Sequence, residues 1–229
     1  MISYIIALDN MGIVFSLVML VILVFSAILH EVAHGFIADR LGDPTARLSG
    51  RLTLNPRKHI DPFMSIALPL ILILSGSPVI FGAAKPVPVD AFNLKDGRKD
   101  IAIVSLAGPL TNVLIAVIAA IILKGLKLSV PVLTGGSYDF IFFIIYPVLL
   151  MITQINLLLA IFNLLPIPPL DGSKIFALIL PEKEAHAYLS LGSIGFFIIF
   201  FLLMFPIGGF SLGSLIFNFV SFSEKLLGM

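Results

Sequence analysis

Residues 11–38 read MGIVFSLVMLVILVFSAILHEVAHGFIA, an apolar run whose only ionisable residues are His30, Glu31 and His34. A helix crosses the hydrocarbon core of a bilayer with about 20 apolar residues, so this run is long enough to span. It is too long for a signal peptide, and residues 1–10 contain no Lys or Arg to begin one. We therefore predict a retained transmembrane helix that carries ionisable groups near its end.

The composition of the whole chain also indicates a membrane protein. Hydrophobic residues make up 59% of the 229 residues, charged residues only 12%, and the mean hydropathy is +1.13, whereas soluble domains carry about 25% charged residues. The net charge of +1 provides no basic field for nucleic acid, so we expect no nucleic-acid partner. With no Cys in the chain, only His, Asp and Glu remain as strong ligands for a metal.

Other stretches have the length of transmembrane helices. Besides residues 11–36, the runs at 100–124 and 140–165 can each span a bilayer. The apolar stretch 188–227 is interrupted by Pro206-Ile207-Gly208-Gly209, and we expect two spans there with a tight connection. The sequence thus predicts about five transmembrane helices.

Three shorter segments are expected to have other structures. Residues 63–74 are apolar but few and contain Pro69, which favours a re-entrant or interfacial segment. Residues 47–54 alternate partly between apolar and polar, and residues 85–89 are extended by their prolines, so we expect short strands or PPII segments in these loops.

The predicted fold class is therefore an all-α polytopic membrane protein with small β elements in its loops. No polar stretch is long enough to form an independent core. We expect a single membrane-embedded domain over residues 1–229, with a core at about 11–175 and a C-terminal helix pair at about 188–227.

The basic residues predict the orientation in the membrane. Two polar connections, 40–61 and 85–99, hold nine of the fourteen Lys and Arg, and the positive-inside rule places both in the cytoplasm. Three more basic residues fall on that side in this arrangement: Lys174, Lys183 and Lys225. The count is then twelve inside against two outside. The same arrangement puts His30, His34 and the approach to Asp171 in the cytoplasmic half.

The segment His30-Glu31-Val32-Ala33-His34 is an H-E-x-x-H motif on a predicted helix. Positions i and i+4 share a helix face, so the two imidazoles can bind one zinc ion, and Glu31 can act on the attacking water. Ionisable groups within a membrane helix are costly and usually functional. The alternative is that both histidines are interfacial residues at the helix end, with Glu31 paired to Arg40 or Arg47.

A catalytic zinc usually has three protein ligands, and Asp171 is the best candidate for the third. It follows Asn163-Leu-Leu-Pro-Ile-Pro-Pro-Leu, where three prolines prevent a continuous helix, and irregular backbone at membrane depth is tolerated only beside a cavity or within protein. Alternatively, Asp171 is the N-cap of a helix that starts near Ser173. His59 and His186 lie beside charges in polar loops and are expected to face solvent.

Three separated motifs together resemble the site-2 proteases, membrane zinc peptidases that cut substrates within their transmembrane helices. The motifs are His30-Glu31-xx-His34, Gly108-Pro109-Leu-Thr-Asn112 and Asn163-xx-Pro166 with Leu170-Asp171-Gly172. The similarity covers about residues 25–175 and includes Gly42-Asp43-Pro44 and Asn55-Pro56, which are typical of compact bacterial and archaeal members. The PDZ domain and CBS pair of larger relatives are not expected here.

The resemblance implies an enzyme that binds one zinc per chain through His30, His34 and Asp171, with Glu31 as general base. It also implies that Asn112 and Asn163 lie near the site and hold the substrate carbonyl or the oxyanion. From the residues alone, these two Asn could equally make hydrogen bonds between packed helices.

The implied partners are transmembrane protein substrates and the lipid bilayer, and the implied location is a prokaryotic cell membrane. An unwound substrate could pair with a strand edge, for which residues 47–54 are the candidate. The competing function is a metal-ion transporter or metal-binding membrane protein that uses the same ligands.

Overall fold

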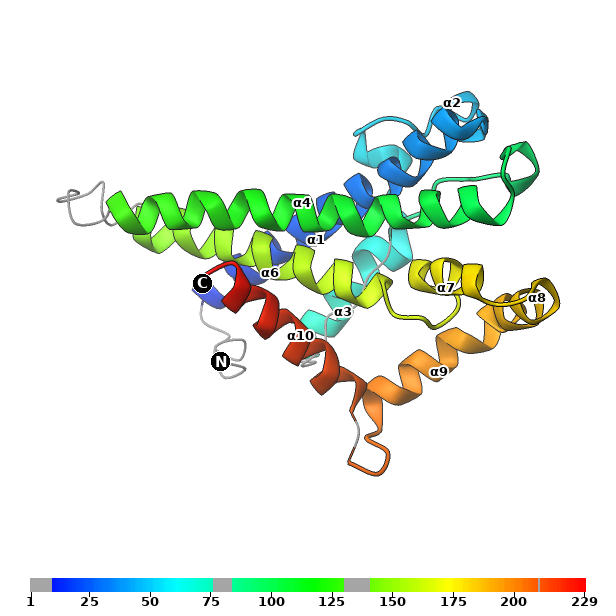
Figure 1. Ribbon diagram of the computed structural model, residues 1–229. Helices are drawn as coiled ribbons and strands as arrows, with labels where there is room; N and C mark the ends of the chain where they lie inside the picture. The colour runs from blue at the N-terminus through cyan, green and yellow to red at the C-terminus, as the bar shows by residue number, and fades with distance from the viewer. Residues whose placement is uncertain (1–9, 76–83, 130–140, 210) are drawn as a thin grey trace.

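The computed structural model describes residues 10–75, 84–129, 141–209 and 211–229. Three long helices lie side by side at its centre (Figure 1): α1 Asn10–Leu41, α4 Arg98–Ser129 and α6 Tyr146–Asn163. Each is long and apolar enough to cross a membrane. The chain is therefore an all-α membrane protein at its core.

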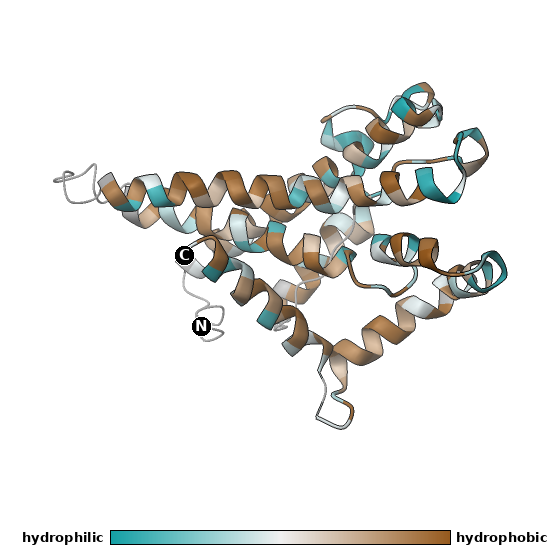
Figure 2. Ribbon diagram, in the orientation of Figure 1, coloured by the Kyte–Doolittle hydropathy of each residue, from teal (hydrophilic) through white to brown (hydrophobic). Residues whose placement is uncertain are grey.

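The inner and outer faces of these helices differ in side-chain size. Large apolar side chains such as Leu114, Ile118 and Ile121 are exposed on α4, whereas Ala116 and Ala120 are fully buried. Lipid provides no hydrophobic force between helices, so small residues that allow close backbone approach are enriched where membrane helices meet. The long helices are coloured hydrophobic along most of their length (Figure 2). Hydrophilic residues are seen at the end of the bundle near α2, where the polar connections 40–61 and 85–99 lie; we call this the loop-bearing end.

The segment predicted not to span forms a short helix. It consists of η3 Pro62–Ala67 and α3 Leu68–Leu74. Asp61 starts it, because its carboxylate accepts hydrogen bonds from the N–H groups of Phe63 and Met64. Together these elements are shorter than the apolar helices that can cross a bilayer.

The prediction of small β elements is wrong, because the described residues contain no strand. Within residues 47–54, the chain first completes helix α2, Thr45–Leu48, and then turns at Gly50, whose φ of +64° does not fit a strand. Residues 85–89 form no strand, although the N–H group of Lys85 donates to the carbonyl oxygen of His59 at 2.7 Å. Pro86 and Pro88 lack the N–H groups that a strand ladder needs.

The prediction of about five spans is also wrong for the described residues. Helix α9, Gly192–Met204, has 13 residues and α10, Leu212–Leu226, has 15. At 1.5 Å per residue they are about 20 Å and 22 Å long, less than the roughly 30 Å of the hydrocarbon core. The described helices provide three spans, or four if α8, Glu182–Ser190, forms one bent span with residues 194–204 at 65°.

The direction of α10 changes the number of basic residues on each side of the membrane. Gly208 and Gly209, with φ of +56° and +84°, turn the chain between α9 and α10. The chain end then lies against α4, where a β-carbon on Gly228 would be 2.7 Å from Lys124 Nζ. Lys225 therefore lies at the Lys124 end of the bundle, not with the polar loops as predicted. Eleven Lys and Arg then lie on the side of the polar loops and three on the opposite side, so the basic residues are still concentrated beside the polar loops.

Candidate metal centre

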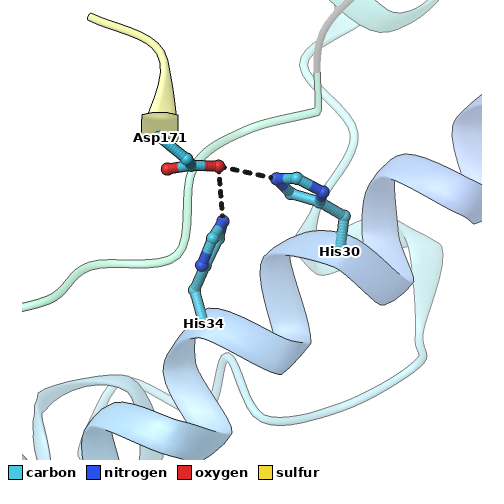
Figure 3. Close-up of side chains that lie close together, drawn as sticks. All are labelled: His30, His34 and Asp171. Atoms are coloured by element: carbon cyan, nitrogen blue, oxygen red, sulfur yellow. Dashed lines mark hydrogen bonds and ion pairs between the residues drawn. The ribbon is translucent and has the colours of Figure 1, made fainter. Parts of the chain in front are cut away.

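Three side chains from two distant parts of the chain meet inside the bundle. His30 and His34 project from one face of α1, and Asp171 is the first residue of α7, Asp171–Phe176. The Oδ2 atom of Asp171 lies 3.1 Å from the Nε2 atom of each histidine. Figure 3 shows both imidazoles pointing at this one oxygen. All three residues are buried.

This donor set fits zinc. The ligand atoms of the three residues lie within 4.8 Å of one another, and two imidazole nitrogens with one carboxylate match the three protein ligands of many catalytic zinc sites. The two rings are 4.6 Å apart at an interplanar angle of 86°, so their lone pairs converge from different directions. A single ion between these atoms would neutralise the buried carboxylate.

Two glycines allow the elements of the site to approach. A β-carbon on Gly172 would lie 2.2 Å from the carbonyl oxygen of Leu164, so only glycine lets α7 begin against the end of α6. A β-carbon on Gly108 would lie 2.5 Å from Nε2 of His30 and 2.5 Å from Nε2 of His34. The backbone of α4 is therefore one wall of the metal centre.

Asp171 does not act as the N-cap of α7, the alternative considered from the sequence. Leu170 is at the N-cap position, and no side chain caps the helix. The carboxylate of Asp171 is instead shared between the two histidines and Lys174, whose Nζ atom is 3.2 Å from Oδ1.

The second nitrogen of each histidine is held by a hydrogen-bond acceptor. Nδ1 of His34 donates to the carbonyl oxygen of Val104 at 2.7 Å, and Nδ1 of His30 donates to Oδ1 of Asn112 at 2.6 Å. An acceptor at Nδ1 favours the tautomer in which Nε2 has the free lone pair. Both rings are therefore oriented with Nε2 towards Asp171, where each lone pair would be available to a bound ion.

The two asparagines singled out by the sequence have different surroundings. Asn112 is fully buried, and its Nδ2 atom donates to Oδ1 of Asn156 at 2.8 Å. Asn163 is half-buried and donates to Leu159 in its own helix at 2.9 Å. The sequence analysis missed Asn156, although the cost of an amide in an apolar helix applies to it as it does to Asn112.

Glu31 lies beside the three residues but outside their cluster. Its Oε2 atom accepts a hydrogen bond from the N–H group of Val87 at 2.8 Å. The alternative in which Glu31 pairs with Arg40 or Arg47 is wrong. The side chain of Arg47 binds Asp39 at 3.0 Å, and Arg40 lies 4.8 Å from the centre of the Phe36 ring.

Residues 85–90, the segment whose Val87 N–H group contacts Glu31, are held at both ends. Arg51 donates to the carbonyl oxygens of Lys85 and Pro86 at 2.8 Å and 3.1 Å. At the other end, Asp43 accepts from the N–H group of Asp90 at 2.7 Å and from Asn93 at 2.9 Å. Asp43 is fully buried; although burial alone would raise its pKa, these bonds and those from Thr45 hold the pKa below the usual range.

Neither of the other two histidines joins the metal centre among the described residues. His186 is exposed, as predicted. The prediction that His59 faces solvent is wrong, because His59 is fully buried and its Nε2 atom donates to the carbonyl oxygen of Thr53 at 2.8 Å. Burial lowers the pKa of His59, so the ring packs as a neutral core residue of the loop.

Residues 18–206 match the sequence profile of Peptidase family M50. The chain belongs to this family. One relative, "Putative zinc metalloprotease YwhC" of Bacillus subtilis, is 35% identical over 85% of this chain and 83% of its own length. "Putative zinc metalloprotease Rip2" of Mycobacterium tuberculosis is 32% identical over 78% of this chain and 62% of its own length. "Putative zinc metalloprotease MJ0611" of Methanocaldococcus jannaschii is 28% identical over 76% of each chain. No solved structure matches the chain.

Family M50 is the site-2 protease family, so the resemblance drawn from the three motifs is confirmed. The M50 chain is a zinc-dependent membrane protease, and the ion-transporter alternative is not supported. Its three long apolar helices agree with a multi-pass protein in a lipid environment.

Proposed function

We propose that this chain hydrolyses peptide bonds within or near transmembrane segments of membrane proteins, as a single domain over residues 1–229. In this proposal His30, His34 and Asp171 bind one zinc ion, and Glu31 is the general base. The observation that carries it is the convergence of two Nε2 atoms on one carboxylate oxygen, 3.1 Å from each, inside a bundle of apolar helices.

Each residue has a distinct task in the reaction. Zinc, when bound, supplies Lewis acidity for the substrate carbonyl and lowers the pKa of water at the site. Glu31 accepts the proton of the attacking water and returns it to the leaving amine. The Val87 N–H group holds one carboxylate oxygen of Glu31 and leaves the other for this proton transfer.

Asn163 remains the candidate for contact with the substrate carbonyl. It is half-buried at the end of α6, and its Nδ2 atom is engaged within its own helix, which leaves the Oδ1 atom and a second N–H available. Asn112 is less suited to this task because both ends of its carboxamide are bonded to protein groups.

The proposed location is a prokaryotic cell membrane with the active site towards the cytoplasmic side. Eleven of the fourteen basic residues at the loop-bearing end support this orientation. The relatives named above come from bacteria and an archaeon.

The proposal is tested by measuring zinc content and cleavage of single-span substrates by detergent-solubilised protein. Glu31→Gln should keep its zinc and lose activity by at least about 100-fold, because it removes a proton acceptor and not a ligand. Asp171→Asn should lose both zinc and activity. The matched control is Glu184→Gln, at an exposed position on α8, which should behave like the parent.

Two results would contradict the proposal. A Glu31→Gln protein that cleaves at the parent's rate would remove Glu31 from the mechanism. A parent that carries metal across vesicle membranes and cleaves nothing would indicate a transporter.

A further inference from the structure

A chain of hydrogen bonds runs through the centre of the bundle and ends on His30. On α6, Nδ2 of Asn156 donates to the carbonyl oxygen of Ile152 at 2.8 Å and to Oγ of Ser26 at 2.9 Å. Oδ1 of Asn156 accepts from Nδ2 of Asn112 at 2.8 Å. Oδ1 of Asn112 then accepts from Nδ1 of His30 at 2.6 Å. The chain connects α1, α4 and α6.

Because these side chains are buried, it is fixed which partner donates and which accepts in each hydrogen bond. Asn112 and Asn156 are fully buried and Ser26 is almost so. An unsatisfied polar group in such a place is costly, because it has lost its hydrogen bonds to water and gained none in the protein. Every contact in the chain must therefore pair one donor with one acceptor.

The backbone carbonyl of Ile152 determines the direction, because a carbonyl oxygen can only accept. Asn156 must present its NH₂ group to this oxygen and so turns its own Oδ1 towards Asn112. Asn112 must therefore donate from its NH₂ group to that oxygen, which turns its own Oδ1 towards His30. The Nδ1 atom of His30 must then carry the proton. Nε2 of His30 is then the nitrogen that faces Asp171, and it would give its lone pair to an ion bound between them.

We propose that Asn112 and Asn156 are positioning residues that set the tautomer and orientation of His30 for metal binding. The inference rests on the proposed function in one respect, which is that His30 is a zinc ligand. It assigns the Gly108–Asn112 motif two separate tasks, since Gly108 makes room for the imidazoles and Asn112 orients one of them.

His34 provides an internal comparison. Its Nδ1 atom donates directly to the backbone of Val104, a contact that no side-chain substitution removes. Loss of the amide chain should therefore disturb one histidine and leave the other in place. The alternative is that the amides only join the three helices, in which case their loss would lower stability without changing either histidine.

The test uses the full-length protein in detergent and two measurements. Zinc affinity is obtained by competition with a chelator. The tautomer of each histidine is read from ¹⁵N chemical shifts of the metal-free protein, which contains only four His. The variants are Asn112→Leu, Asn112→Asp, Asn156→Leu and the control Thr153→Val. Thr153 is fully buried on α6, but its hydroxyl donates to the carbonyl oxygen of Leu149 in its own helix at 3.0 Å.

We expect Asn112→Leu to weaken zinc binding by about 10- to 100-fold, the usual effect of losing a partner behind a metal ligand. The ¹⁵N spectrum should show His30 as a mixture of tautomers and His34 unchanged. Asn112→Asp should recover most of the affinity, because a carboxyl group still offers an acceptor to Nδ1. Asn156→Leu should give a smaller loss, since Asn112 is then free to rotate. Thr153→Val should match the parent in both measurements.

Two outcomes would overturn the inference: a parent-like zinc affinity and tautomer in Asn112→Leu, or an equal loss in Thr153→Val. If Asn112→Leu does not fold, Asn156→Leu decides, because it does not contact His30. A parent that binds no zinc would contradict the proposed function instead. The tautomer measurement on metal-free protein would still test the amide chain.

Discussion

The metal centre and the C-terminal helix pair are both set in apolar surroundings, but they are held together differently. Around the metal centre, buried histidine, amide and carboxylate groups bind one another across α1, α4, α6 and α7. The pair α9 and α10 packs through an apolar cluster centred on Ile199, Leu212 and Ile216. Its polar link to α6 is a hydrogen bond of 2.8 Å from Gln154 to Glu224.

The difference follows from the solvent. Apolar side chains gain little by leaving lipid for protein, so apolar contact alone positions membrane helices weakly. Directed hydrogen bonds and close backbone contacts at glycine define positions more narrowly. We therefore expect the metal centre to be rigid and sensitive to small changes, and the C-terminal pair to tolerate them.

Removal of zinc should have the largest effect, and this effect should be confined to the metal centre. A ligand at about 1,000 times its dissociation constant stabilises a conformation that binds it, relative to one that does not, by roughly 4 kcal/mol, so without zinc the local openings that separate the three ligands become more frequent. Hydrogen exchange with and without a chelator should show loss of protection around His30, His34 and α7, and little change in α10. A uniform change over all helices would contradict the comparison.

Gly108→Ala should have the next largest effect. The added methyl group would lie 2.5 Å from both Nε2 atoms, so the imidazoles must move from their positions around Asp171. We expect zinc affinity to fall by at least about 100-fold, measured by chelator competition. Gly125→Ala is the matched control on the same helix, because a β-carbon there meets nothing within 4 Å. Equal zinc binding by the two variants would show that α4 is not a wall of the site.

Gly195→Ala should have a moderate effect of a different kind. A β-carbon on Gly195 would lie 1.7 Å from the carbonyl oxygen of Pro168, whereas one on Gly192 would make an ordinary contact at 3.8 Å. The first variant must push α9 away from the loop that leads to Asp171. We expect a lower melting temperature by several degrees with zinc still bound, and no change for Gly192→Ala. Loss of zinc in Gly195→Ala would mean that α9 helps to position Asp171.

Glu224→Ala should have the smallest effect. It removes the hydrogen bond from Gln154, and such bonds in membrane proteins contribute about 0.6 kcal/mol on average. Glu224→Gln keeps an acceptor and should match the parent more closely. Thermal unfolding of both variants provides the measurement. A loss above about 2 kcal/mol, or any loss of zinc, would show that α10 is coupled to the metal centre.

The sequence was sufficient for the features that depend on local geometry. Two histidines four residues apart share a helix face whatever surrounds them, and a long apolar run with few charges must be a membrane helix. The prolines before Asp171 correctly predicted irregular chain there, and the structure brings this residue to the histidines. The zinc-protease family could be recognised because these local motifs recur in order.

Only the tertiary structure decided which partner each buried polar group has. The sequence left Asn112 between substrate contact and helix packing, did not select Asn156 or Ser26, and placed His59 in solvent. It also predicted short strands or PPII segments at 47–54 and 85–89, whereas Arg51 of the first segment donates to the backbone of Lys85 and the N–H group of Val87 donates to Glu31. Such pairings depend on the rotation of each helix about its axis and on where glycines allow contact. These are relations between residues up to 141 positions apart, and local hydropathy and periodicity do not encode them.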